Sequence, residues 1–306
     1  MLKEVFISPQ VFTEPTINPY NWKDIKYLLE NLKSSGYIIG VRRKKWIKDV
    51  MWNISRLEPK VKDHLMHILT GLKDRDRIVD HPIFENTIEA ESGWLEFILK
   101  LNELRTLHSI IATHSDQNMM SLDQLEDVNI NDEYGISGSK SFMLSEENME
   151  IILLPFLSYA KKITIIDPYF YLNYDRYENS LNLIARMLGE RRGELRQVGS
   201  ITIHCKWASK LNNYKKVWAN IIGDIHERYG HTINVFAWEE CDGDLKMHDR
   251  YIISNQAGLV SAAGTNIDDL QQSEWSIKDY RELGTIMAHY KENSSPFKLM
   301  HTFSSQ

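Results

Sequence analysis

The regular alternation of helical segments with short apolar strands after residue 145 is the feature that most constrains the fold of this chain. Runs rich in Ile, Val and Thr predict strands at residues 161–167, 200–207, 232–238, 249–254 and 258–264. Apolar residues at intervals of three and four predict helices at residues 145–160, 179–193 and 214–230. This order predicts an α/β fold with a mixed sheet flanked by helices. The last two strands, joined by the turn "NQAG", form an antiparallel edge.

The first 140 residues follow a different pattern, which predicts a mainly helical domain. Helical spacing occurs at residues 21–36, 44–57, 60–72 and 94–107, whereas only "YIIGV" and "HSIIATH" are strand candidates. The polar stretch at residues 115–140 is typical of a loop or linker. We therefore expect two domains, residues 1–140 and 141–306, in keeping with a length of 306 residues.

Composition and the apolar runs predict the compartment in which the protein resides. The first ten residues lack the apolar core of a signal peptide, and the most apolar run, "IILLPFL", is too short to span a bilayer. The two cysteines offer neither a disulfide framework nor metal-ligand spacing. We expect a soluble, cytoplasmic protein. The net charge of −6 argues against coating nucleic acid by bulk electrostatics, but it is compatible with a local basic groove.

The stretch "LKMHDRYIISNQAGLVSAAGTN" contains the strongest candidate site. His248 and Arg250 stand two residues apart at the mouth of an expected strand, where alternating side chains would face the same side. Asp167 also ends an expected strand, in "IIDPYF". Because active residues of α/β sheets gather at strand ends, these residues are candidates for one site.

The segment from His248 to "GTIM" resembles one half of the phospholipase D superfamily, whose motif is H-x-K-x4-D followed by a small-residue strand, a G-S/T-x-N turn and a downstream Glu. His248 matches the histidine, Arg250 stands at the lysine position and Asn255 at the aspartate position. In "AAGTN" either Thr265 or Asn266 could fill the asparagine role. The resemblance covers the C-terminal half, and it implies a phospholipase D-like domain at 141–306.

The same resemblance implies that Glu282, in "SIKDYRELGTIM", precedes an apolar strand and supports the histidine. It further implies two facing motifs, with one histidine forming a phosphohistidine while the other protonates the leaving group. Only one such motif occurs in this chain, so we expect a homodimer. The expected activity is that of a metal-independent phosphodiesterase without cofactor, a nuclease rather than a lipase. By analogy, similar H-D-R variants in bacterial phage-defence effectors suggest that role.

Two departures from the motif leave the chemistry open. Arg250 keeps the positive charge and can grip phosphate bidentately, but it could instead be a surface partner of Glu239 or Glu240. Asn255 removes a carboxylate, for which Asp249, Asp268 or Asp167 could compensate. Glu282 could equally be a solvated charge beside Arg281.

The cluster "RRKKW" in the N-terminal region is a second phosphate- or nucleic-acid-binding candidate. Arg42, Arg43 and Lys44 could track a nucleic-acid backbone beside Trp46, although such a run is more often a solvated loop or helix start. Two alternatives to the nuclease remain. One is a catalytically inactive phospholipase D-like domain that binds phosphoinositide membranes or nucleic acid, with membrane the less expected partner. The other is a scaffold that binds a protein partner through its N-terminal domain.

Overall fold

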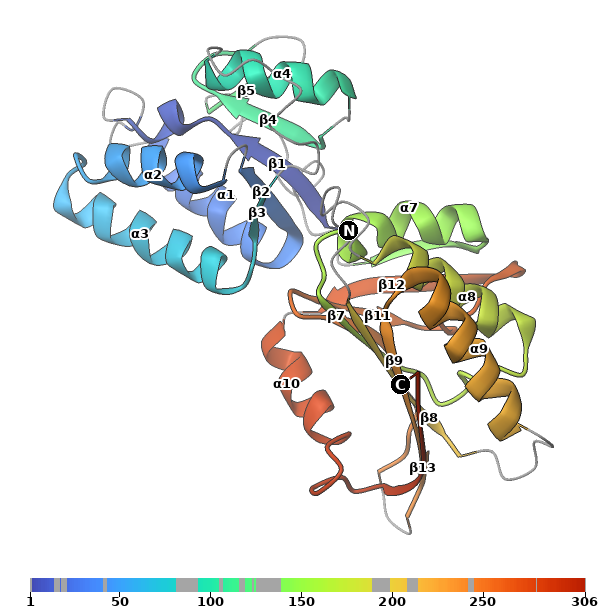
Figure 1. Ribbon diagram of the computed structural model, residues 1–306. Coiled ribbons are helices and arrows are strands. Elements are labelled where there is room, and N and C mark those ends of the chain that lie inside the picture. The colour runs from blue at the N-terminus through green and yellow to red at the C-terminus, as the bar shows by residue number, and fades with distance from the viewer. Residues whose placement is uncertain are drawn as a thin grey trace. The chain divides into compact units, whose positions relative to one another are not determined.

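The computed structural model divides the chain into two compact units, Met1–Ser137 and Gly138–Gln306, where the sequence placed the boundary at residue 140. It describes residues 2–13, 17, 21–40, 43–80, 93–104, 107–115, 119–122, 124, 139–188, 199–207, 214–241, 245–278 and 280–305. Both units are α/β (Figure 1). Among the described residues, no helix has the length and apolar character needed to cross a bilayer.

The N-terminal unit contains a five-stranded sheet in the order β3-β2-β1-β4-β5, and every pair in it is parallel. Its strands are β1 (Lys3–Ile7), β2 (Gly36–Gly40), β3 (Ile78–Asp80), β4 (Ser109–Ala112) and β5 (Met120–Ser121). Its helical elements are the 3₁₀-helix η1 (Pro9–Phe12), α1 (Asn21–Ser35), α2 (Arg43–Ile54), α3 (Pro59–Asp74) and α4 (Trp94–Leu104).

The N-terminal region is mainly helical, as predicted, but its helices accompany a sheet that the sequence largely did not reveal. Helices hold more of the described residues than strands do, but they surround a parallel sheet of which the sequence analysis foresaw only β2 and β4. Four successive residues of β1 are buried, so this strand shows no alternation of apolar and polar residues. β3 and β5 are too short to display a period of two.

The C-terminal unit contains an eight-stranded mixed sheet in the order β13-β9-β8-β7-β10-β11-β12-β6. Its strands are β6 (Ser139–Leu144), β7 (Lys162–Ile166), β8 (Ser200–Lys206), β9 (Thr232–Glu239), β10 (Arg250–Ser254), β11 (Gly258–Ser261), β12 (Asp268–Lys278) and β13 (Lys298–Ser304). β7, β8 and β9 run parallel to one another, and all other neighbours are antiparallel. The predicted antiparallel pair at 249–264 is thus confirmed as β10 and β11, but it is not the predicted edge, because β12 and β6 continue the sheet beyond β11.

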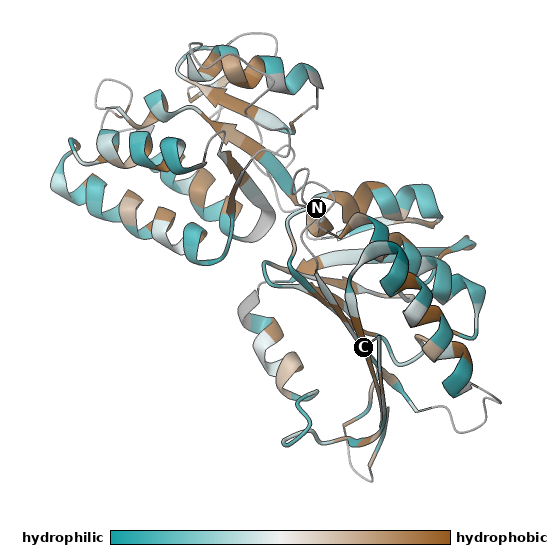
Figure 2. Cartoon of the chain, in the orientation of Figure 1, coloured by the Kyte–Doolittle hydropathy of each residue, from teal (hydrophilic) through white to brown (hydrophobic). Residues whose placement is uncertain are grey.

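Helices cover both faces of this sheet. Figure 1 shows α7 (Glu146–Leu157), α8 (Asp175–Met187) and α9 (Tyr214–Tyr229) on one face and α10 (Tyr280–Ala288) on the other. Ser145 caps α7 as predicted, because its side chain accepts the backbone N–H of Asn148 at 3.3 Å. In Figure 2 hydrophobic residues concentrate on the central strands, whereas much of α8 and α9 is hydrophilic. The core of this unit therefore lies along the sheet.

The segment around Glu282 is a helix, not the predicted strand. Leu283, Ile286, Met287 and Tyr290 recur at helical spacing, and all four pack against a cluster that includes Ile166, Tyr251 and Ile253 of the sheet. The short apolar run "GTIM" is compatible with a strand or a helix, and its packing under the sheet distinguishes the two.

Candidate functional site

Asp167 and Arg250 form an ion pair where β7 ends and β10 begins. The antiparallel register pairs Tyr251 with Ile166, so the next position brings Arg250 opposite Asp167. Arg250 Nε lies 3.8 Å from Asp167 Oδ1; the Asp167 side chain is fully buried and the Arg250 side chain is 18% exposed. The guanidinium also donates from Nη1 to the carbonyl of Ala262 at 2.8 Å. Arg250 is therefore held in place by groups from two other parts of the sheet.

Three hydrogen bonds satisfy the buried Asp167 carboxylate. Thr265 donates to Oδ2 from its backbone N–H at 3.2 Å and from its hydroxyl at 3.0 Å, and the Tyr169 N–H donates to Oδ1 at 2.9 Å. Burial raises the pKa of Asp167, while these donors and Arg250 act in the opposite direction. The site thus holds a buried carboxyl group with three fixed hydrogen-bond donors and one cationic partner, Arg250.

The turn after β11 delivers Thr265 to Asp167. Gly264 has φ +133°, a conformation open essentially only to glycine, and a Cβ there would lie 2.6 Å from Asn266 Oδ1. Ser261 Oγ accepts the Gly264 N–H at 3.0 Å, and Ser273 Oγ accepts the Ala263 N–H at 3.2 Å. The small residues of "VSAAGTN" therefore allow this turn to bring Thr265 to the Asp167 carboxylate.

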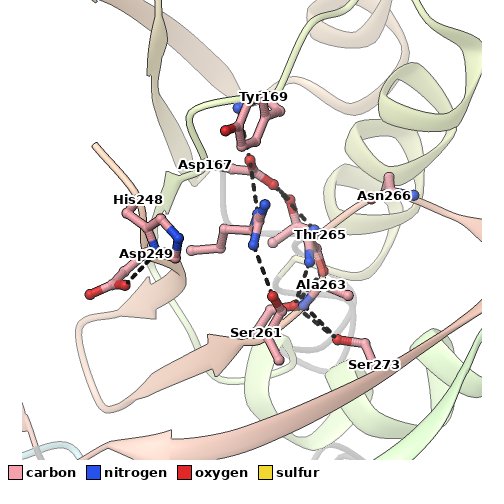
Figure 3. Close-up of polar contacts among 12 residues, drawn as sticks. Asp167, Tyr169, His248, Asp249, Ser261, Ala263, Thr265, Asn266 and Ser273 are labelled. Carbon is pink, nitrogen blue, oxygen red and sulfur yellow. Dashed lines mark hydrogen bonds and ion pairs between the residues drawn. The ribbon is translucent and has the colours of Figure 1, made fainter. Parts of the chain in front are cut away.

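His248 is exposed beside this network rather than part of it. Its side chain is 84% exposed, and Figure 3 shows His248 and Asp249 to one side of Asp167 and Thr265. Because β10 begins at Arg250, the alternation used to orient His248 does not extend to it. Nδ1 lies 3.3 Å from Asp249 Oδ1, and the Tyr251 hydroxyl donates to Asp249 Oδ2 at 2.9 Å. With its proton on Nδ1, His248 would present an Nε2 lone pair to solvent.

The backbone before His248 is anchored by Glu240. One oxygen of this carboxylate accepts the Met247 N–H at 3.0 Å and the other lies 2.8 Å from Lys206 Nζ. Hydrogen bonding to Lys206 holds the pKa of Glu240 below its ordinary value. Met247 itself packs with Trp238 and Phe297. His248 therefore sits between two fixed points, Met247 and Arg250.

The other two residues expected beside His248 lie elsewhere. Asn255 follows the far end of β10, where its Oδ1 accepts the backbone N–H of Lys161 at 2.9 Å. Glu282 has a 61% exposed side chain on α10, 3.4 Å from Lys278 Nζ, which is the solvated arrangement considered as an alternative. The carboxylate that accompanies Arg250 is Asp167, and Glu240 pairs with Lys206 instead.

The remaining candidate residues are Asn266 in the glycine turn and the basic residues of "RRKKW". Asn266 is buried, but its amide donates to Gln271 Oε1 at 3.2 Å, so Thr265 is the residue of this turn that reaches Asp167. Lys44 is exposed on α2. Arg42 and the Arg43 side chain lie outside the described residues. Within the described part, no group of three or more His, Cys, Asp or Glu residues could hold a metal ion.

Sequence reasoning did not assign Tyr169, Tyr251 or Glu240 to the site. Tyr169 follows Asp167 closely, and its position in "IIDPYF", just after a strand end, was a usable signal. Tyr251 was read only as a strand residue, and nothing in its local sequence distinguishes its hydroxyl from that of a core tyrosine. Glu240 could be assigned only after the register of β8 and β9 placed it beside Lys206.

Comparison with known proteins adds little to this description. No protein-family model matches the chain, and no curated protein matches it. A solved structure described as "Structure of TrmBL2, an archaeal chromatin protein, shows a novel mode of DNA binding" is 12% identical, with 80% of this chain and 72% of that chain covered. Its TM-score is 0.29, so the likeness carries no argument about fold or function.

Proposed function

We propose that the C-terminal unit is a phospholipase D-like phosphodiesterase that works as a homodimer, with nucleic acid as the substrate. The observation that carries the proposal is the chain of contacts from Tyr251 through Asp249 to the exposed ring of His248, next to the ion pair of Arg250 with Asp167. A carboxylate on Nδ1 leaves Nε2 as the nucleophile, and guanidinium N–H groups suit the non-bridging oxygens of a phosphodiester.

The reaction needs one histidine from each copy. Nε2 of one His248 attacks phosphorus, a P–N bond forms and the P–O bond to the leaving group breaks. The imidazolium of the second copy's His248 gives its proton to the leaving oxygen. It then takes a proton from the water that attacks phosphorus, so that a P–O bond forms, the P–N bond to the first histidine breaks and both histidines return to their starting states. A two-fold axis beside His248 would supply this pair.

A specific observation favours a second candidate, a phosphate-binding domain without hydrolysis. Asn255 and Glu282 both lie away from His248, so Asp249 is the only acid that the described residues bring into contact with the ring. Such a domain would retain binding of nucleic acid or of a phosphoinositide membrane, but it would cleave neither.

The test is cleavage of end-labelled single- and double-stranded DNA and RNA in chelator by wild type, His248→Ala and His67→Ala. His67 is an exposed histidine on α3 and serves as the matched control. We expect His248→Ala to lose activity by at least about 100-fold, whereas His67→Ala matches wild type. Exchange of subunits between wild type and His248→Ala should lower activity beyond simple dilution.

Two results would contradict the proposal. Cleavage that survives in His248→Ala would show that His248 is not the nucleophile. Cleavage that requires added divalent metal would contradict the metal-independent mechanism. Binding without cleavage in all three proteins would support the phosphate-binding domain instead.

A further inference from the structure

The segment 168–174, "PYFYLNY", displays aromatic rings beside the candidate site. Phe170 and Leu172 are buried, and the Phe170 ring packs against Tyr177 at 5.1 Å between centroids. Tyr169 and Tyr174 are each 47% exposed. The buried residues fix the backbone, so the two exposed rings are presented with little conformational freedom left to lose on binding.

Each exposed ring already has an arginine nearby. The Arg250 guanidinium lies 5.2 Å from the Tyr169 ring centroid, and the Arg176 guanidinium lies 5.8 Å from that of Tyr174. An exposed tyrosine ring beside a guanidinium can stack with a further flat π-system. Nucleobases have such a face, whereas phosphate and lipid headgroups do not.

The same two arginines have much of their charge offset by carboxylates. Arg250 pairs with Asp167 at 3.8 Å, and Arg176 Nη1 lies 3.9 Å from Asp268 Oδ2. The chain as a whole carries a net charge of −6. Duplex DNA hides its base faces and is bound mainly by neutralising many phosphates, whereas the rings described here are accompanied by two arginines that each already have a carboxylate nearby. Unstacked bases, in contrast, can use the exposed rings directly.

The two rings connect to the Asp167 network, beside which His248 is exposed. The Tyr169 N–H donates to Asp167, and Tyr169 shares Arg250 with that carboxylate. The Arg176 carbonyl accepts the N–H of Ile267, two residues after Thr265. Figure 3 shows Tyr169 next to Asp167, with His248 on the same side of the drawn network as Asp249. A base stacked on Tyr169 would therefore lie close to Arg250, which follows His248 by two residues in the chain.

We propose that the substrate is single-stranded nucleic acid, whose bases stack on Tyr169 and Tyr174. The inference rests on the proposed function and adds the substrate class to it. It makes the tyrosines substrate-binding residues that select for unpaired bases, while His248 acts on the phosphodiester.

The test measures binding by fluorescence anisotropy with three labelled ligands of equal length: a single-stranded oligonucleotide, its duplex and an abasic oligonucleotide. The abasic strand keeps every phosphate and lacks every base. The variants are Tyr169→Ala, Tyr174→Ala and Tyr169→Phe, with Tyr27→Ala as control, because Tyr27 on α1 is also 47% exposed. Cleavage of the same ligands is followed in parallel with His248→Ala.

We expect the single strand to bind more tightly than the duplex and the abasic strand. Tyr169→Ala and Tyr174→Ala should each weaken single-strand binding roughly 5- to 150-fold and leave abasic binding unchanged. Tyr169→Phe should restore affinity because it keeps the ring, and Tyr27→Ala should match wild type. Equal affinity for normal and abasic strands, or no effect of either tyrosine, would overturn the inference.

The outcomes separate this inference from the proposed function. Tyrosine-dependent binding of single strands without any cleavage would keep the substrate class and reject the phosphodiesterase. Cleavage that depends on His248 but proceeds equally on normal and abasic strands, whatever stands at position 169, would keep the phosphodiesterase and reject the stacking surface.

Discussion

The buried His204 on β8 should make the folded chain lose stability in mild acid. Its side chain is 5% exposed, and its ring lies between those of Phe236 and Tyr290, at centroid distances of 5.3 and 4.9 Å. Nδ1 accepts the indole N–H of Trp238 at 3.1 Å, so the neutral ring is the form this environment accommodates. Burial lowers the pKa of His204 from 6.5 to about 4.

The sign and size of the effect follow from this shift. A lowered pKa in the folded state means that the unfolded chain binds the proton more tightly. The contribution of His204 to the free energy of unfolding therefore does not change with pH above 6.5. It becomes unfavourable as the pH falls from 6.5 toward about 4. A change of about 2.5 pKa units, at about 1.36 kcal/mol each, corresponds to a loss of roughly 3 kcal/mol.

The assay is urea unfolding of the full chain between about pH 7.5 and pH 4, for wild type and His204→Phe. The variant should be less stable near neutrality by about 1–3 kcal/mol, because the buried Trp238 N–H loses its acceptor. On acidification, its free energy of unfolding should also fall by about 3 kcal/mol less than that of wild type. The difference between the two curves isolates His204, since all other titrating groups are shared.

The refuting result is a pair of parallel curves across this pH range. It would mean that the His204 ring reaches water or gains a stabilising partner when protonated. His67→Phe, at an exposed position on α3, is the control whose acid-dependent loss should match that of wild type.

Three further substitutions test the packing around the site and the start of α7, each by urea unfolding of the full chain. Thr265→Val removes the hydroxyl donor to Asp167 and should cost about 1.5–3 kcal/mol, with Thr265→Ser close to wild type; equal losses in both would point to lost packing instead. Gly264→Ala forces a Cβ into a glycine-only conformation and should cost about 1–3 kcal/mol; an unchanged midpoint would contradict the assigned turn. Ser145→Ala should cost about 1 kcal/mol through the lost cap to Asn148, and Ser145→Asp should largely retain it.

The candidate site was only partly predictable. Strand ends predicted Asp167 and Arg250 as site residues, the resemblance of "AAGTN" to the superfamily's turn predicted Thr265, and the structure brings these three together. The same resemblance predicted Asn255 and Glu282 beside His248, but they lie apart from it. Glu282 illustrates why: the apolar residues after it fit a short strand or a helix equally well, and only their packing under the sheet distinguishes the two.

Local features of the fold could be predicted from the amino-acid sequence. The capped start of α7, the antiparallel pair β10 and β11, and the alternation that yields an α/β fold all follow from periodicity and turn chemistry within short windows. The parallel sheet of the N-terminal unit was largely hidden, because strands buried on both faces show no alternation.

The pairing of charged side chains, in contrast, depends on how distant strands pack. The sequence offered Glu239 or Glu240 as surface partners of Arg250 and left open which aspartate compensates for Asn255, whereas strand register places Arg250 beside Asp167. Register depends on how distant strands align their buried faces, so no local window contains that information. The same packing paired Glu240 with Lys206 and left His248 exposed between two anchored residues.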